Sequence, residues 1–162
     1  YANWTNISDG RFKKNVREDV AGLDFIKRLR PVTYQIDVTG LSSKLNENKG
    51  SDSTGTMKTA MAEKERMIWT GFIAQEVELA ALASGFNFSG VDKPRNEYGV
   101  YGLRYAEFVV PLVKAIQEQQ LLIEAQTNQL QTLNAKFSGL QKLNDQLLKR
   151  IEILELLKQT KN

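Results

Sequence analysis

The stretch LLIEAQTNQLQTLNAKFSGLQKLNDQLLKRIEILELL, residues 121–157, decides how this chain is organised. When residues are counted in sevens from Val109, apolar side chains recur at the first and fourth positions of each heptad, named a and d. The a positions are Val109, Ile116, Ile123, Leu130, Phe137, Asn144, Ile151 and Lys158, and the d positions are Leu112, Gln119, Gln126, Leu133, Leu140, Leu147 and Leu154. A register of this length predicts a long helix in a left-handed coiled coil with other chains. The alternative, a single helix packed on its own domain, seldom keeps a strict register beyond about 25 residues.

Apart from Lys158 near the end of the register, three polar residues occupy core positions: Gln119 and Gln126 at d, and Asn144 at a. Polar side chains there cost stability but penalise shifted alignments, so we interpret them as residues that fix the register. The core residues alone leave the number of chains open. Asn144 and Ile151 at a positions favour two chains, whereas Phe137 at a does not.

The outer heptad positions give two further indications. Arg150 at g and Glu155 at the following e form a favourable pair between parallel chains, which indicates a parallel arrangement. Several outer positions are apolar, which indicates either a widened core or a docking surface for another segment. We favour the widened core, because single exposed apolar residues are common. These residues are Leu122, Leu143, Leu148, Ile153 and Leu156.

The sequence ahead of the long helix begins with a helix and a strand. Apolar residues at three-residue spacing predict an amphipathic helix over residues 19–29, which Pro31 ends. Alternation of apolar and polar residues over 32–38 predicts a half-buried strand. Residues 39–56 are rich in Gly, Ser, Asn and charge, so we expect a loop, a protruding hairpin or a disordered insert there, followed by a helical turn over residues 57–66.

A second strand and helix follow this polar segment. Residues 67–74 read as a buried strand interrupted by Gly71. Residues 75–83 predict a helix that Gly85 ends, and a short strand is expected over 98–103. The predicted buried face of that helix consists of Val77, Ala80 and Ala81.

Composition restricts the chemistry that the chain can carry. Its 162 residues, 41% hydrophobic and 25% charged, suit one compact domain plus an extension. The chain has no cysteine and no histidine, which excludes disulfides and thiolate metal sites and removes the commonest general base. We expect no metal and no cofactor, and catalysis would have to use hydroxyl, amine or carboxylate groups.

Neither a membrane nor a nucleic acid is an expected partner of this segment. No apolar run approaches the roughly 18 to 20 residues that a membrane span needs. The basic residues Arg11, Lys13, Lys14 and Arg17 are too few for a nucleic-acid surface without an accompanying aromatic or glycine motif. The chain opens on YANWT without a methionine or a signal-peptide pattern, so we expect a fragment of a longer protein.

A serine and a lysine stand close together in the segment NISDGRFKKN, residues 6–15. Ser8 and the Asp-Gly pair after it favour a turn that folds the Lys13 amine back towards the Ser8 hydroxyl. A free lysine, with a pKa of about 10.4, is a poor base at neutral pH unless burial or nearby positive charge lowers that value. Arg11 and Lys14 are expected to supply part of that charge, and burial on assembly the rest. Spacing alone leaves two interpretations open, a Ser-Lys catalytic dyad and an ordinary solvated turn.

Four blocks of sequence, in this order and ahead of the heptads, carry a resemblance to a known family. They are SDGRFKKNV, GLDFIKRLRPVTYQ, GFIAQEVE and YGLRYAEFVVPLVKAIQEQ. The chain resembles the endosialidase-type intramolecular chaperone domain, which ends many phage tailspikes and tail fibres and bacterial surface proteins. A relative of that domain occurs in the myelin regulatory factor family. The insert at residues 39–66 has no counterpart there that we can place.

The resemblance implies a C-terminal module that forms a homotrimer, helps the upstream part of its own polypeptide to fold and then cuts itself off. It implies Ser8 as nucleophile and Lys13 as base of a single-turnover serine peptidase, with Ile7–Ser8 as the scissile bond. Asp9 and Arg11 match the other fixed positions of the S-D-x-R-x-K block. They would orient the turn or stabilise developing charge.

These observations give an expected domain organisation. Residues 1–7 end the upstream client segment, 8–104 form the chaperone head with its insert at 39–66, and 105–162 form the trimerisation helix. The expected fold class is α+β, a small mixed head followed by a long C-terminal helix in a parallel trimeric coiled coil. Two alternatives stay open: a non-cleaving trimeric stalk or adhesin tip, and a coiled-coil adaptor for a protein partner. The expected location is a phage virion tail or a bacterial cell surface, with assembly in the cytoplasm.

Overall fold

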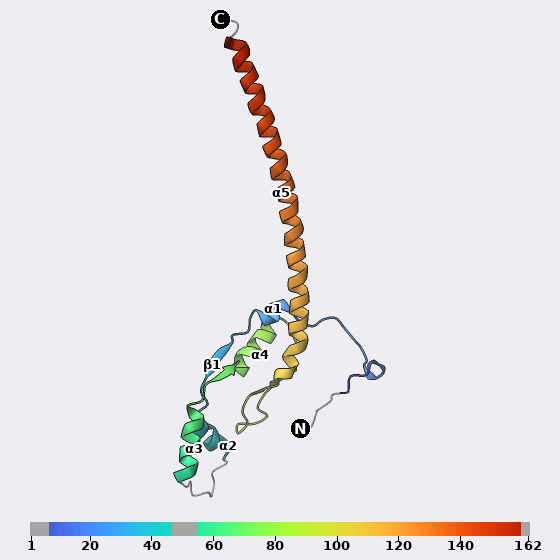
Figure 1. The fold of residues 1–162 in the computed structure, drawn as a ribbon. Helices are drawn as coiled ribbons and strands as arrows, with labels where there is room; N and C mark the ends of the chain where they lie inside the picture. Colours follow the sequence, from blue (N-terminus) through green and yellow to red (C-terminus); the bar gives the residue numbers. More distant parts are fainter. Residues whose placement is uncertain (1–6, 47–54, 160–162) are drawn as a thin grey trace. The chain divides into compact units, whose positions relative to one another are not determined.

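The computed structural model describes residues 7–46 and 55–159 (Figure 1). The chain divides into two compact units, Tyr1–Ile116 and Gln117–Asn162, which we call the head and the rod and describe separately. In chain order the elements are η1 (Gly10–Phe12), α1 (Leu23–Ile26), β1 (Val32–Tyr34), α2 (Val38–Leu45), α3 (Gly55–Glu65), β2 (Trp69–Gly71), α4 (Ala74–Ala83), β3 (Val91–Asp92), β4 (Gly102–Leu103), η2 (Tyr105–Phe108) and α5 (Val109–Gln159). The structure is therefore mixed, with short strands and a long C-terminal helix, as predicted.

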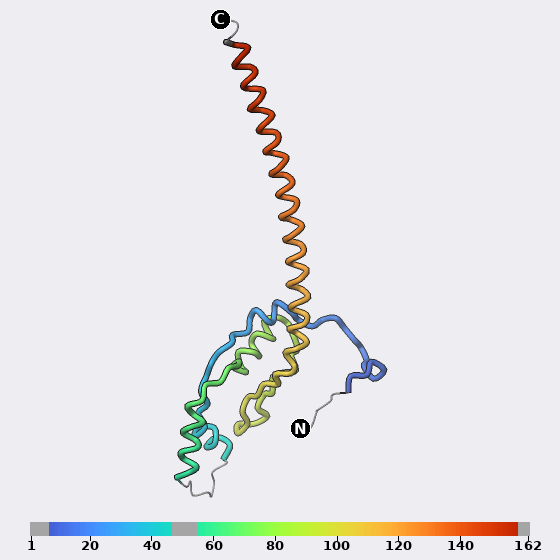
Figure 2. Tube along the Cα trace, in the orientation of Figure 1, coloured from blue at the N-terminus to red at the C-terminus, as the bar shows by residue number. Residues whose placement is uncertain are grey.

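Two small antiparallel sheets organise the head. The β1 strand pairs with β2 in a register that places Val32 opposite Gly71 and Tyr34 opposite Trp69. The β3 strand pairs with β4, although residues 93–101 separate the two in sequence. The α2 and α3 helices lie side by side next to the sheet of β1 and β2 (Figures 1 and 2).

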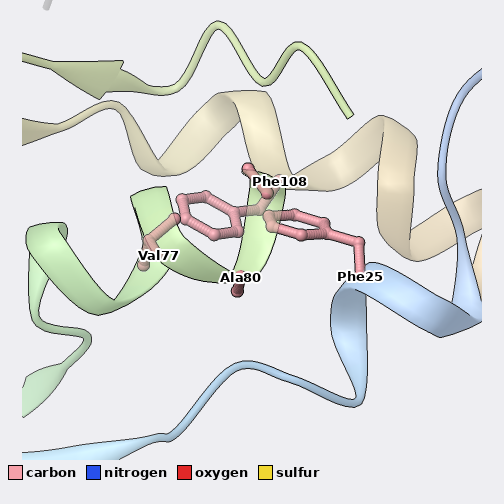
Figure 3. Packing of buried hydrophobic residues seen from close by; sticks show 5 residues of the cluster. Phe25, Val77, Ala80 and Phe108 are labelled. Atoms are coloured by element: carbon pink, nitrogen blue, oxygen red, sulfur yellow. The ribbon is translucent and has the colours of Figure 1, made fainter. Parts of the chain in front are cut away.

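The core of the head is aromatic and lies between α1, α4 and η2. Phe25 of α1 is fully buried, and its ring lies 6.4 Å from the ring of Phe108 in η2. Figure 3 shows these two side chains meeting beside Val77 and Ala80 of α4. The predicted buried face of this helix is confirmed, since Val77, Ala80 and Ala81 are all buried. Burying one phenylalanine or valine side chain contributes about 1.5–3 kcal/mol, so this cluster holds the head together.

The end of α4 also follows the prediction. Gly85 adopts a φ of +64°, a left-handed conformation that glycine reaches without a steric penalty. Phe86 N–H then donates to the Ala81 carbonyl at 2.9 Å, so the chain reverses directly after the helix.

The first helix and the first strand are shorter in the structure than the sequence predicted. The helix expected over 19–29 is reduced to α1, because Gly22 has a non-helical backbone (φ −97°, ψ −103°) at its N-cap. The strand expected over 32–38 ends at Tyr34. Asp37 instead caps α2, since its carboxylate accepts the Gly40 N–H at 2.6 Å.

The interpretation of residues 39–56 as loop or disordered insert is wrong where α2 forms, whereas the helical turn expected over 57–66 is part of α3, Gly55–Glu65. One backbone conformation and one side-chain contact, neither of which composition revealed, fix these helices. Asn46 ends α2 in a left-handed conformation, φ +56°, and Thr39 donates from both its N–H and its hydroxyl to Glu65 of α3. Residues 47–54 of the predicted insert lie outside the described residues.

The second predicted strand is shorter and more exposed than expected. Only Trp69–Gly71 of residues 67–74 is a strand, and Ile68 beside it is 73% exposed, so it is not a buried strand. The strand expected over 98–103 is reduced to β4, and its partner β3 was expected to be loop. Strands of two or three residues, paired across a long loop, are too short to leave a periodic signal in the sequence. The predicted strand bounds differ from the observed ones for this reason.

Glycine at position 71 has a steric reason. A Cβ built at Gly71 would collide with the Tyr105 hydroxyl and would lie 3.3 Å from the Tyr34 ring. That hydroxyl accepts the Phe72 N–H at 3.1 Å, which ties the end of β2 to η2. The glycine therefore makes room for a side chain, and does not merely interrupt a strand.

Candidate functional site

The predicted turn around Ser8 forms, with η1 at its centre. The Asp9 side chain caps this short helix by accepting the Arg11 N–H at 3.0 Å. The Asp9 carbonyl accepts the Phe12 N–H and the Gly10 carbonyl accepts the Lys13 N–H, each at 3.1 Å. These three bonds fold the chain back between Ser8 and Lys13.

The turn brings the two predicted dyad side chains together. Lys13 Nζ donates a hydrogen bond to Ser8 Oγ at 2.9 Å. This distance lies in the range of about 2.6–3.2 Å expected between a nucleophile and its base. In this bond Lys13 Nζ is the donor, so the ammonium group must lose a proton before it can accept the proton of the Ser8 hydroxyl. The contact is a structural finding, and the catalytic roles stay a prediction.

Asp9 and Arg11 form a two-pronged ion pair across the turn. Arg11 Nε donates to Asp9 Oδ2 at 3.0 Å, and Arg11 Nη2 donates to the same oxygen at 2.6 Å. The side-chain bonds from Arg11, and next its backbone N–H, hold the pKa of the Asp9 carboxyl below its usual value. The same carboxylate raises the pKa of the Arg11 guanidinium. The pair is placed to orient the turn, one of the two roles expected for it.

The turn is open to solvent in the single chain. Ile7, on the upstream side of the predicted scissile bond, is 90% exposed, and Phe12 is 76% exposed. Asn15 has a φ of +54°, a left-handed conformation that asparagine tolerates better than most residues. Side chains on both sides of the turn are thus exposed to solvent.

Comparison with known proteins identifies the segment that contains this turn. The family model for chaperone of endosialidase matches residues 8–85. Residues 8–85 belong to that family. The match begins at Ser8 and ends just after α4, at Gly85. No curated protein and no solved structure matches the chain. Membership in the chaperone-of-endosialidase family supports an intramolecular chaperone role, and such a role implies a client fused upstream.

The predicted register residues all lie on α5. Gln119, Gln126 and Asn144 are exposed in the single chain. The apolar core positions of the rod are exposed as well, from 46% for Leu147 to 64% for Leu154. A helix with a continuous exposed apolar stripe has the surface that a coiled coil requires. The number of chains stays a prediction.

The head also contains an ion-pair network that the sequence did not reveal. Glu78 of α4 accepts the Tyr101 hydroxyl at 3.1 Å and pairs with the Lys93 amine. The hydrogen bond from Lys93, and next that from Tyr101, lower the pKa of Glu78. The network ties α4 to the segment around β3 and β4. No local pattern announces it, because the partners lie far apart in the sequence.

Two classes of site were searched for in the part of the chain that the structure describes. Among residues 7–46 and 55–159, no group of three or more acidic side chains is placed to hold a metal ion. No helix within these ranges is long and apolar enough to cross a membrane.

Proposed function

We propose that this chain is a C-terminal intramolecular chaperone that assembles as a homotrimer and then releases itself by cutting the Ile7–Ser8 bond. The observation that carries this proposal is the 2.9 Å hydrogen bond between Lys13 Nζ and Ser8 Oγ, in a turn directly after the bond to be cut. The start of the family match at Ser8 supports the same division between client and chaperone.

The reaction begins with the Ser8 hydroxyl, which attacks the carbonyl carbon of Ile7. Its proton passes to the neutral Lys13 amine and from there to the backbone nitrogen of Ser8, which leaves as an amine. The Ile7 C–N bond breaks and an ester to Ser8 Oγ forms. One water then hydrolyses the ester, which frees an Ile7 carboxylate and restores the hydroxyl.

Proximity replaces substrate binding in this scheme. Nucleophile and scissile carbonyl are adjacent in one chain, so no pocket is required and each molecule reacts once. The Asp9–Arg11 pair holds the turn in which this geometry exists. Withdrawing the turn from water, when copies or the folded client cover it, would favour the neutral amine that the first step needs.

Assembly rests on the rod. Three α5 helices in parallel would bury the exposed a and d residues, and would hold the three upstream segments in equal register. Gln119, Gln126 and Asn144 would penalise staggered alignments of the helices. The client would be a fibre, spike or surface protein of a phage tail or a bacterial cell.

The proposal is tested by intact-mass measurement of the chain fused behind its natural upstream segment. Native protein is compared with the Ser8→Ala and Lys13→Ala variants. Lys58→Ala is the matched control, because it removes an exposed lysine of α3, outside the turn, and leaves the bond between Lys13 and Ser8. We expect a fragment that begins at Ser8 from the native chain and the control, and an uncut chain from the two dyad variants.

Sedimentation of the same samples separates chaperone from peptidase. A native chain that stays uncut but sediments as a trimer would refute self-cleavage and leave a permanent trimer clamp, the non-cleaving alternative. A stable monomer at micromolar concentration would refute the assembly proposal.

A further inference from the structure

A groove in the head runs between β4 and the segment that joins β2 to α4. One wall is the continuous stretch 100–103, which ends in β4, and the other is the stretch 72–75, which leads into the first turn of α4. Tyr34 and Tyr105 complete the lining, and the groove has a volume of about 530 Å³. Four extended residues span about 13 Å, so the wall that includes β4 is long enough to hold a short extended segment.

Aromatic rings line the groove, and contacts outside it hold these rings in place. The Phe72 and Tyr105 rings are stacked with their centroids 6.2 Å apart, and the Tyr105 hydroxyl accepts the Phe72 N–H at 3.1 Å. The Tyr101 hydroxyl donates to Glu78 at 3.1 Å. Because rings that are already fixed lose little conformational freedom on binding, the groove is preorganised for an apolar contact.

The β4 strand has a free edge beside this groove. Of the strands within the described ranges, only β3 pairs with it. Arg104 N–H donates to the Gly90 carbonyl at 2.8 Å, and the next pair along the ladder is Leu103 opposite Val91. Since hydrogen-bonded and non-hydrogen-bonded pairs alternate in an antiparallel ladder, the N–H and C=O of Leu103 point away from β3. A further strand can be hydrogen-bonded at this edge, and Leu103 itself lines the groove.

The lining selects against charged ligands. None of the ten residues that line the groove is charged, although a quarter of the chain's residues are. Glu76, directly after this lining on α4, is paired with Arg30, and Glu78 is paired with Lys93. A charged group that entered the groove would be buried without a partner, which is costly. A segment that binds there is therefore uncharged where it contacts the groove.

We propose that this groove binds an uncharged, extended segment of the upstream client, which adds to the free edge of β4 as a third strand. The inference rests on the chaperone function proposed above and names the part of the client that the head contacts. Strand addition needs a segment whose own N–H and C=O groups are unpaired, and a client that is still folding exposes such segments. The groove then releases the segment once it pairs within the client.

A contact of a few residues is enough for this role. Client and chaperone share one polypeptide, so the segment is present at a high effective concentration. Weak binding also permits release when the client folds. The groove therefore needs neither the area nor the affinity of a permanent interface.

Photochemical cross-linking tests the contact in the full chain fused behind its natural upstream segment. A benzophenone side chain is placed at position 100, where Val100 lines the groove and is 46% exposed. The matched control carries it at position 82, where Leu82 is 67% exposed near the end of α4, outside the groove. Both chains also carry Ser8→Ala, which keeps the client attached. They are illuminated during refolding from urea and again after folding, and mass spectrometry locates the cross-links.

We expect position 100 to cross-link to a stretch of the upstream segment that contains no charged residue, with a yield that falls once the client has folded. Gln75→Glu and Gln75→Lys place a charge of either sign in the groove, and each should lower this yield at least about fivefold, because the charge lacks a partner there. The same changes at Gln117, which is exposed on α5 outside the groove, should leave the yield unchanged. Leu103→Pro removes the edge N–H and should also lower the yield, whereas Leu103→Val keeps that donor.

Four results would overturn this inference. They are equal yields from positions 100 and 82, cross-links from position 100 only to a second copy of the chain, a loss caused by one sign of charge alone, and full cross-linking in a Leu103→Pro chain that keeps the native urea midpoint. None of them would refute the assembly and the cleavage proposed above, because sedimentation and intact mass measure those separately.

Discussion

Replacing Gly71 by alanine should strain the head at the point where β2 meets η2. The new methyl group would occupy the space of the Tyr105 hydroxyl, which cannot move freely because it accepts the Phe72 N–H at 3.1 Å. Overpacking of this kind typically costs about 1–3 kcal/mol of unfolding free energy. We expect Gly71→Ala to fall in that range.

A second substitution should relieve this strain. Tyr105→Phe removes the hydroxyl, which leaves the new methyl group 3.4 Å from the ring carbon that carried it, an ordinary contact. Alone, Tyr105→Phe loses one hydrogen bond, worth about 1 kcal/mol. The double variant should therefore be about as stable as Tyr105→Phe, with a favourable coupling equal to the Gly71→Ala loss, about 1–3 kcal/mol.

Urea unfolding of the four proteins measures this coupling. Trp69 lies in β2 two residues from Gly71, and its fluorescence reports on this sheet once Trp4 is replaced by phenylalanine. All four proteins must be compared at one chain concentration, because association adds to apparent stability. If the losses of the two single variants simply add in the double variant, the hydroxyl does not fill the space above Gly71 and the reasoning fails.

Three further predictions concern the head. Phe108→Ala empties the centre of the aromatic core and should cost about 3–5 kcal/mol in urea unfolding, and a loss below about 1 kcal/mol would contradict the packing described. Gly85→Ala forces a side chain into a φ of +64° and should cost about 1–2 kcal/mol, with Gly85→Asn less harmful, as thermal unfolding would show. Glu78 has a pKa held below its unfolded value by Lys93 and Tyr101, so its contribution is present above about pH 4.3 and is lost as the pH falls through the lower, folded pKa. Glu78→Gln should therefore be less stable near neutral pH and should lose less stability on acidification, and urea midpoints that fall in parallel for both proteins would refute the assignment.

The site divides into a part that local sequence predicted and a part that it did not. The turn at Ser8 was predictable because aspartate and glycine favour it through their own backbone preferences. The ion pair between Asp9 and Arg11 was not predicted, because it forms only once the turn brings the two side chains together.

The sequence by itself determined the elements whose signal repeats along the chain: the long α5 helix, and α4 with Val77, Ala80 and Ala81 on its buried face. Helical periodicity is local, so several turns of one pattern suffice to reveal it. Tertiary structure alone decided the rest: that Asp37 caps a helix in a polar segment, that β3 pairs with β4, and that Tyr105 requires Gly71. Each of these depends on one contact between residues that no repeating pattern connects, and a single contact becomes visible only once the chain has brought its partners together.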